Sequence, residues 1–196
     1  MAKTEKVINI KPLKIGRIKV KVIGRTPYLP EPMDMSVLER YNQKKSKQTY
    51  KKDDISEEEK SEAKYYFTEK GKKGIPVRAF YNSMIRASSY IFDKKDGGMR
   101  NVKEGVSILG NIIPLNYKRE VKVIHWGRTS GMTGAPRKII RNSFEDWSCE
   151  FELEYNQEQL SPEHIINILN WAGFHIGVGG FRKEKTGNYG SFYVEV

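Results

Sequence analysis

The sequence predicts an α+β fold of the ferredoxin-like type, in which two helices pack on one face of an antiparallel sheet. Residues 15–26 and 143–155 alternate between apolar and polar side chains, as half-buried strands do. Residues 77–92 and the segment after Ser161 repeat apolar residues at helical spacing. The first helix follows the first strand, and the second precedes the last strand. This order is a split βαβ motif, in one domain covering residues 1–196.

The first strand (IGRIKVKVIGRT) has apolar residues on one face and only the cations Arg17, Lys19 and Lys21 on the other. Prolines follow it and end strand pairing. An inserted arm, residues 33–73, then changes the composition to lysine, glutamate, glutamine and serine. Residues 56–67 within it begin with a capping serine and predict a short helix. The arm is either a solvated appendage or a surface that contacts a partner.

The helix predicted at 77–92 (VRAFYNSMIRASSYIF) has apolar positions that include Tyr81 and Met84. A surface turn at 93–98 follows. Residues 106–115 predict one strand with a bulge or sharp exit, because the run contains Gly110 and a proline. Residues 121–126 predict another strand. The next segment, residues 127–141 (GRTSGMTGAPRKIIR), is predicted to be a loop, with four basic residues and no acid.

The strand at 143–155 directs Trp147 and Cys149 to one face and its glutamates to the other, so a nucleic acid must approach the molecule from elsewhere. The last helix begins with Ser161 as its N-cap and Pro162 at its first position. Gly173 is predicted to end this helix. A final strand is predicted at 190–196.

The composition favours a polyanionic partner. The 196 residues are 38% hydrophobic and carry a formal net charge of +11. Solubility alone is the other explanation of this charge. The only cysteine, Cys149, falls in an apolar strand position and indicates a reducing compartment. The sequence has no apolar run that would cross a membrane, so we expect a cytoplasmic protein without a membrane partner.

Residues 173–190 (GFHIGVGGFRKEKTGNYG) join the last helix to the last strand. Glycines permit close backbone approach and allow successive N–H groups to converge on a phosphate. Basic side chains neutralise phosphates, and aromatic side chains stack on bases. A hairpin-like turn is the structural alternative. The predicted nucleic-acid contacts in this segment are Gly177, Gly179, Gly180, Phe181, Arg182, Lys183, Lys185, Gly187, Tyr189 and Gly190. Those around the basic loop are Trp126, Arg128, Arg137, Lys138 and Arg141.

Two segments resemble the RAMP superfamily, the RNA-recognition-motif-like proteins that include the backbone subunits of CRISPR effector complexes. GVGGFRKEKTGNYGSFYV is similar to the superfamily's C-terminal glycine-rich loop, and GIPVRAFYNSMIRASSYI to its segment of Ile-Pro followed by a helix with a central arginine. The arm is thumb-like in its position, and NSFEDWSCEFEL resembles small phage-borne relatives. The resemblance implies RNA-backbone contacts by the glycine-rich loop and by Arg86 of the helix.

Catalysis and metal binding have weaker support. Related endoribonucleases use histidine for general acid–base chemistry, and only His175 lies near the glycine-rich segment. A lone loop histidine is more often structural, so we expect no enzymatic activity. The three histidines and one cysteine lack metal-ligand spacing, and we expect no metal or cofactor. Trp147 and Trp171 are expected in the core, whereas Trp126 is expected to stack on bases.

The sequence therefore predicts a non-catalytic protein that binds single-stranded RNA or DNA with little sequence preference, and that assembles as a homo-oligomer along the strand. One alternative is a phage interaction protein, such as an anti-CRISPR protein, that docks onto an effector-complex backbone subunit through the 33–73 arm. A metal-independent endoribonuclease is the other. The sequence leaves the choice between RNA and DNA open.

Overall fold

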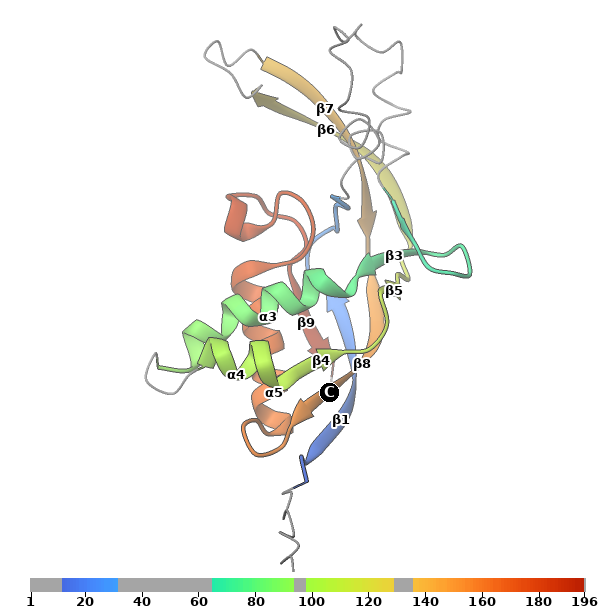
Figure 1. The fold of residues 1–196 in the computed structure, drawn as a ribbon. Coiled ribbons are helices and arrows are strands. Elements are labelled where there is room, and N and C mark those ends of the chain that lie inside the picture. Colours follow the sequence, from blue (N-terminus) through green and yellow to red (C-terminus); the bar gives the residue numbers. More distant parts are fainter. Residues whose placement is uncertain (1–11, 32–64, 94–97, 129–135, 196) are drawn as a thin grey trace, which may run out of the picture.

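The main sheet of the protein has the strand order of the predicted fold. A computed structural model describes residues 12–31, 65–93, 98–128 and 136–195. Four antiparallel strands lie in the order β4–β8–β1–β9 (Figure 1). Their bounds are β1 (Ile15–Gly24), β4 (Val106–Ile108), β8 (Ser148–Asn156) and β9 (Phe192–Glu195). Because the first and last strands are neighbours, with a helix before the second and fourth, the ferredoxin-like α+β prediction is confirmed.

Side-chain alternation decides which face of this sheet is buried. Val22 of β1 and Cys149 of β8 point toward the helices and are fully buried. Phe80 of helix α3 (Val77–Ile91) packs on the same face, with its ring centroid 4.9 Å from that of Phe151 and 5.3 Å from that of Phe192. The core therefore lies between the sheet and the helices. The buried stripe of α3 runs through Phe80, Met84 and Ala87, and Tyr81 is only partly buried.

The second predicted helix is confirmed at its start. Helix α5 spans Pro162–Trp171. The backbone N–H of His164 donates to Ser161 Oγ over 3.3 Å, and the backbone N–H of Ser161 donates to His164 Nδ1 over 3.2 Å. This reciprocal arrangement is a capping box, with histidine in the position that glutamate usually takes.

The predicted end of that helix, at Gly173, is wrong. The helical path continues through one π turn, η2 (Ala172–Ile176), and stops at Gly177, whose φ is +79°. Gly173 serves another purpose, because a Cβ atom there would overlap the carbonyl oxygen of Phe192. The glycine lets the helix lie directly on β9.

Two runs that the sequence predicts as single strands are divided in the structure. The run at 106–115 divides at Gly110, with a φ of +89°, into β4 and β5 (Ile112–Pro114), which belong to different sheets. The run at 143–155 divides at Asp146, with a φ of +50°. The next residue, Trp147, is buried, and its indole N–H donates to the Thr26 carbonyl over 2.8 Å.

The basic segment predicted as a loop at 127–141 is largely part of a β-hairpin. Strands β6 (Arg119–Arg128) and β7 (Pro136–Glu145) pair only with each other as a sheet, and they extend beyond one end of the main sheet (Figure 1). Residues 129–135 lie outside the described residues. The chain inserts this hairpin between β4 and β8.

Most of the predicted 33–73 arm, and residues 56–64 of its predicted helix, lie outside the described residues. The helix prediction is wrong at its described end, where β2 (Tyr66–Phe67) pairs with β3 (Lys73–Pro76) around a turn at Gly71. Residues 94–97 of the predicted surface turn are likewise not described, and the unpredicted helix α4 (Gly98–Gly105) follows them. Within the described residues, no helix is long and apolar enough to cross a membrane.

Candidate nucleic-acid interface

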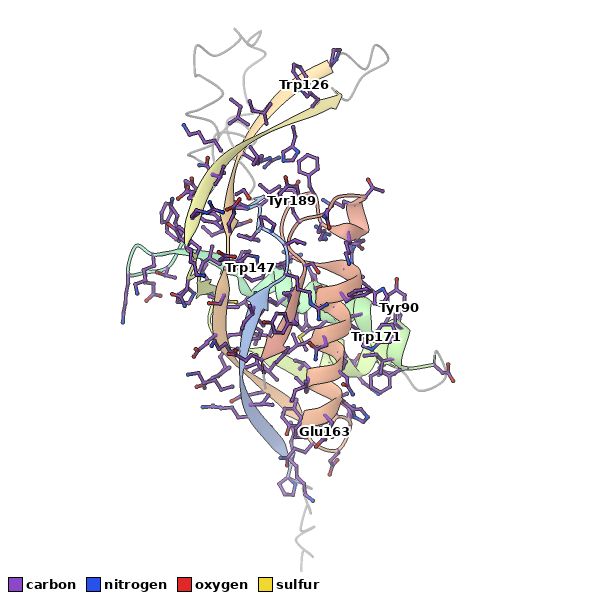
Figure 2. All side chains as sticks on the ribbon, turned by 180° about the vertical axis from the view of Figure 1, so that it is seen from behind. Tyr90, Trp126, Trp147, Glu163, Trp171 and Tyr189 are labelled. Carbon is purple, nitrogen blue, oxygen red and sulfur yellow. The ribbon has the colours of Figure 1, made fainter. Side chains whose placement is uncertain are left out.

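The basic hairpin and the glycine-rich segment meet at one end of the molecule. His125 of β6 stacks on Phe181, with ring centroids 4.5 Å apart and an angle of 18° between the planes. The ring of Tyr189 meets the same histidine edge-on at 5.4 Å. Figure 2 shows Tyr189 where the hairpin leaves the core. The structure thus brings together two segments that are far apart in the sequence.

The two faces of the hairpin differ. His125 lies opposite Ile139 and faces the glycine-rich segment, whereas Trp126 lies opposite Lys138 and takes the other face, as alternation requires. Trp126 is 73% exposed, and the neighbouring Ile124 is 55% exposed. Trp126 therefore does not share one stacking surface with Phe181 and Tyr189, both of which are partly buried.

The base of the hairpin is held by a polar cluster that the sequence did not predict. Lys73 Nζ lies 2.6 Å from Glu120 Oε2, Tyr65 donates to the same carboxylate, and Asn142 donates to the Tyr65 hydroxyl. Burial alone would raise the pKa of Glu120, but the hydrogen bonds from Lys73 and Tyr65 outweigh burial and lower it. The charged carboxylate therefore helps to fix the base of the hairpin to β3.

Close packing against backbone requires several glycines of the glycine-rich segment. A Cβ at Gly179 would overlap the Leu29 carbonyl, one at Gly187 the Phe181 carbonyl, and one at Gly190 the Val178 carbonyl. The backbone N–H groups of Gly177, Gly187 and Gly190 also donate to carbonyl groups inside the chain. Gly180 does the same, donating to Leu29. The expectation that these N–H groups converge on a phosphate is therefore wrong for these four glycines.

Most of the cations expected in this segment are paired with acids. Arg182 bonds Glu184 through Nη2 at 2.8 Å and donates from Nη1 to the Gly179 carbonyl over 3.0 Å. Arg86 of α3 pairs with the same Glu184. Burial lowers the pKa of Arg182, and the positive charge of Arg86 lowers it further. Lys185 pairs with Glu31 at 3.5 Å.

Lys183 differs from these cations. Its Nζ lies 4.0 Å from the centroid of the Phe174 ring, and no described carboxylate pairs with it. This lysine is the only basic residue of the short 3₁₀ turn η3 (Lys183–Lys185) without an acidic partner among the described residues.

On the hairpin, the backbones of Arg128, Arg137 and Lys138 lie in the paired strands, and their side chains are outside the described part of the structure. Arg141 is partly buried. Burial lowers the pKa of His125, and Arg141 lowers it further. His125 is therefore neutral at neutral pH, and it contributes to packing more than to charge.

One sequence prediction about an aromatic residue is wrong. Trp171 was expected in the core, but it is 40% exposed. His175 lies in the π turn, where its ring stacks on Trp171 at 4.7 Å and on Tyr90 at 5.0 Å. The expected role of Trp147 in the core is confirmed. Among the described residues, no group of three or more histidine, cysteine or acidic side chains has an arrangement that would hold a metal ion.

The open face of the main sheet carries its cations in pairs with glutamates. Arg17 Nη2 lies 2.6 Å from Glu154 Oε1 and Lys19 Nζ lies 2.9 Å from Glu150 Oε2. Two of the outward glutamates of β8, Glu150 and Glu154, therefore face basic neighbours on β1.

Comparison with known proteins gives a likeness in fold. No protein-family model matches the chain, and no curated protein matches it. A chain in the cryo-EM structure of the type III-B Cmr-beta complex bound to cognate target RNA superposes with a TM-score of 0.59, at 13% identity, over 93% of this chain. The chain has a RAMP-like fold. This protein spans 60% of the length of the matched chain from the Cmr-beta complex. Cmr6 from Pyrococcus furiosus aligns at a TM-score of 0.45 and 9% identity, covering 93% of this chain and 98% of Cmr6.

Proposed function

We propose that this protein binds single-stranded RNA or DNA with little sequence preference and without catalysing a reaction. The observation that carries this proposal is the contact between His125 and Phe181, which joins the basic hairpin to the glycine-rich segment at one end of the molecule. A cationic hairpin beside a compact loop offers phosphate contacts, and such contacts carry no sequence information.

The proposed contacts divide between the two segments. Arg128, Arg137 and Lys138 of the hairpin neutralise phosphates, and the exposed Trp126 stacks on a base. In the glycine-rich segment, the paired Arg182 and Arg86 shape the loop, and Lys183 contributes charge to a strand. The RAMP-like fold, shared with a chain from a complex bound to target RNA, makes RNA the first ligand to test.

The test is fluorescence anisotropy with labelled single-stranded and duplex RNA and DNA of matched sequence, across a salt series. We expect single strands to bind more tightly than duplexes, and affinity to fall linearly on logarithmic axes as salt rises. The double variant Arg137→Glu and Lys138→Glu should weaken binding at least about tenfold at low salt, because two phosphate contacts become repulsive. Absence of binding, or an unchanged affinity in the double variant, would contradict the proposal.

A protein that docks onto a partner, such as an effector-complex backbone subunit, is the second candidate. The exposed outer face of the hairpin, with Ile124 and Trp126, favours it. Trp126→Ala separates the two candidates. If Trp126 stacks on bases, the affinity for a single strand falls by about 1–3 kcal/mol. If this face docks a protein, the affinity for the strand does not change.

Assembly along the strand belongs to the same proposal. Analytical ultracentrifugation with oligonucleotides of increasing length should show additional copies bound in steps as the strand lengthens. A single copy on every length would exclude side-by-side assembly and leave simple strand binding intact.

A further inference from the structure

A surface on the helical side of the molecule gathers aromatic rings and cations that lie against them. We call it the aromatic ridge, and it consists of Tyr90, Trp171, Phe174, His175, Arg25 and Lys183. Figure 2 shows Tyr90 and Trp171 beside each other on the helices. The ridge overlaps the glycine-rich segment, because Phe174, His175 and Lys183 belong to both.

Three rings of the ridge, those of Tyr90, Trp171 and His175, are nearly parallel, and the Phe174 ring meets His175 edge-on at 82°. Tyr90 is 56% exposed and Trp171 is 40% exposed. Their centroids are 5.9 Å apart with 18° between the ring planes, and the His175 ring is parallel to both within 20°. Since the rings already support one another, they lose little rotational freedom when a ligand stacks on them.

The end of α5 and the π turn η2 carry three of these rings. The π turn follows α5 directly and carries Phe174 and His175, while Trp171 is the last residue of α5. A π turn widens the helix, and such turns are frequent at functional sites. Three large side chains within five residues of one another lie outside the core.

The cations of the ridge lie against rings and not against acids. Lys183 Nζ is 4.0 Å from the Phe174 centroid, and Arg25 Cζ is 6.0 Å from the same centroid and 5.3 Å from that of Tyr193. Among the described residues, no carboxylate forms an ion pair with Arg25 or Lys183. These two positive charges remain available to a polyanion.

We propose that the aromatic ridge is a base-stacking platform, on which a single strand continues from the hairpin and the glycine-rich segment over the helices. Bases stack on Tyr90 and Trp171, and Arg25 and Lys183 neutralise the phosphates beside them. The proposal rests on the function proposed above and adds a second contact region to it. A single-stranded nucleic acid suits this combination, because near-parallel aromatic faces stack on bases while cations beside them neutralise phosphates.

The first test measures affinity by fluorescence anisotropy, with a labelled oligouridylate of about 15 nucleotides. We expect the double variant Tyr90→Ala and Trp171→Ala to bind at least about tenfold more weakly than the wild type. The matched control is Phe67→Ala, which removes an aromatic ring of similar exposure (51%) from strand β2 and should change the affinity less than about twofold. Circular dichroism of each variant reports whether its fold is retained.

The second test does not depend on replacing an aromatic side chain by alanine. Intrinsic tryptophan fluorescence is followed as the oligonucleotide is added to the wild type and to Trp171→Phe, which keeps a ring at that position. Stacking on Trp171 predicts that a substantial part of the quenching disappears in Trp171→Phe. Polyglutamate of matched charge serves as the competing ligand and should cause no such quenching.

The outcomes separate this proposal from the one on which it rests. If the wild type binds the strand, but the ridge variants bind equally well and Trp171 contributes no quenching, the ridge proposal is overturned and strand binding stands. If polyglutamate quenches Trp171 and the oligonucleotide does not, the ridge docks an acidic protein and the proposal is overturned. If the wild type binds no strand, both proposals are wrong.

Discussion

The open face of the main sheet and the aromatic ridge both carry cations, but the cations have different partners. On the sheet, Lys19 and Lys21 of β1 pair with Glu150 and Glu195 of the neighbouring strands. On the ridge, Lys183 lies against an aromatic ring. The difference teaches that a net charge of +11 does not locate a binding surface. A polyanion is attracted where cations lack acidic partners. The regularly spaced lysines of β1 pair with glutamates, so they do not form such a surface.

The ridge differs from the sheet face because part of it belongs to the glycine-rich segment. That segment must therefore be a rigid support for the ridge. Gly190→Ala tests this requirement and should have the largest effect, a loss of about 3 kcal/mol or more in the free energy of unfolding. The position has a φ of +66°, and a Cβ there would overlap the Val178 carbonyl. Urea unfolding measures the loss. Gly71→Ala is the control, because its φ is +73° with no atom within 4 Å of a Cβ, and it should cost only about 1–2 kcal/mol. Equal losses would contradict the rigid support.

Neutralising the ridge cations tests the contrast directly. The double variant Arg25→Gln and Lys183→Gln should bind a single strand about tenfold more weakly, a loss of about 1.4 kcal/mol. The slope of log affinity against log salt should fall by about 0.7 for each phosphate that is no longer neutralised. Lys19→Gln with Lys21→Gln removes the same charge from the sheet face, where glutamates already neutralise it. That variant should change the affinity less than about twofold, and equal effects of the two variants would break the contrast.

Removing an acidic side chain beside the ridge should raise the affinity for a single strand. Glu184 pairs with both Arg86 and Arg182, so Glu184→Gln leaves two cations beside the ridge without a carboxylate. We expect the affinity for a single strand to rise about threefold, close to 0.6 kcal/mol. Anisotropy at low salt measures the gain, which should disappear at high salt. A decrease in affinity would mean that the loop shape held by Glu184 matters more than the freed charge.

The smallest expected effect concerns the contact between the hairpin and the loop. Because burial and Arg141 lower the pKa of His125 from 6.5, the unfolded chain binds more protons than the folded one between the two pKa values. The contribution of His125 is therefore fully present above pH 6.5 and falls as the pH decreases toward the folded pKa. His125→Phe keeps a ring against Phe181 and should lose this pH dependence. Urea unfolding of both proteins between pH 7.5 and about 5 measures it, and parallel curves would contradict the prediction.

The parts of the fold that follow from local sequence could be predicted. Alternation located β1 and most of β8, and the serine and proline at the start of α5 located its first turn. The errors arose where a distant contact decides the structure. From the local sequence, Gly173 is predicted to end a helix. The structure requires glycine there because β9 passes too close for a Cβ atom. The strand breaks at Gly110 and Asp146 depend on which sheet each half joins.

The candidate site was predictable as segments but not as a surface. The sequence pointed to both the basic hairpin and the glycine-rich segment, and the structure brings them together. The sequence could not show that Glu184 pairs with Arg86 and Arg182, or that Glu31 pairs with Lys185. Ion pairs depend on neighbours in three dimensions. Trp171 was expected in the core, but it lies beside the buried stripe of α5, which Ile165, Ile168 and Leu169 form, and it is 40% exposed.

The main sheet ends in two short strands, β4 with three residues and β9 with four. These short edge strands offer few free backbone N–H and C=O groups to an incoming chain, but β9 covers only Lys21–Gly24 of β1, so residues 15–20 of β1 have no strand partner on that side among the described residues. An added strand from another molecule would therefore pair with this part of β1, and not with β4 or β9.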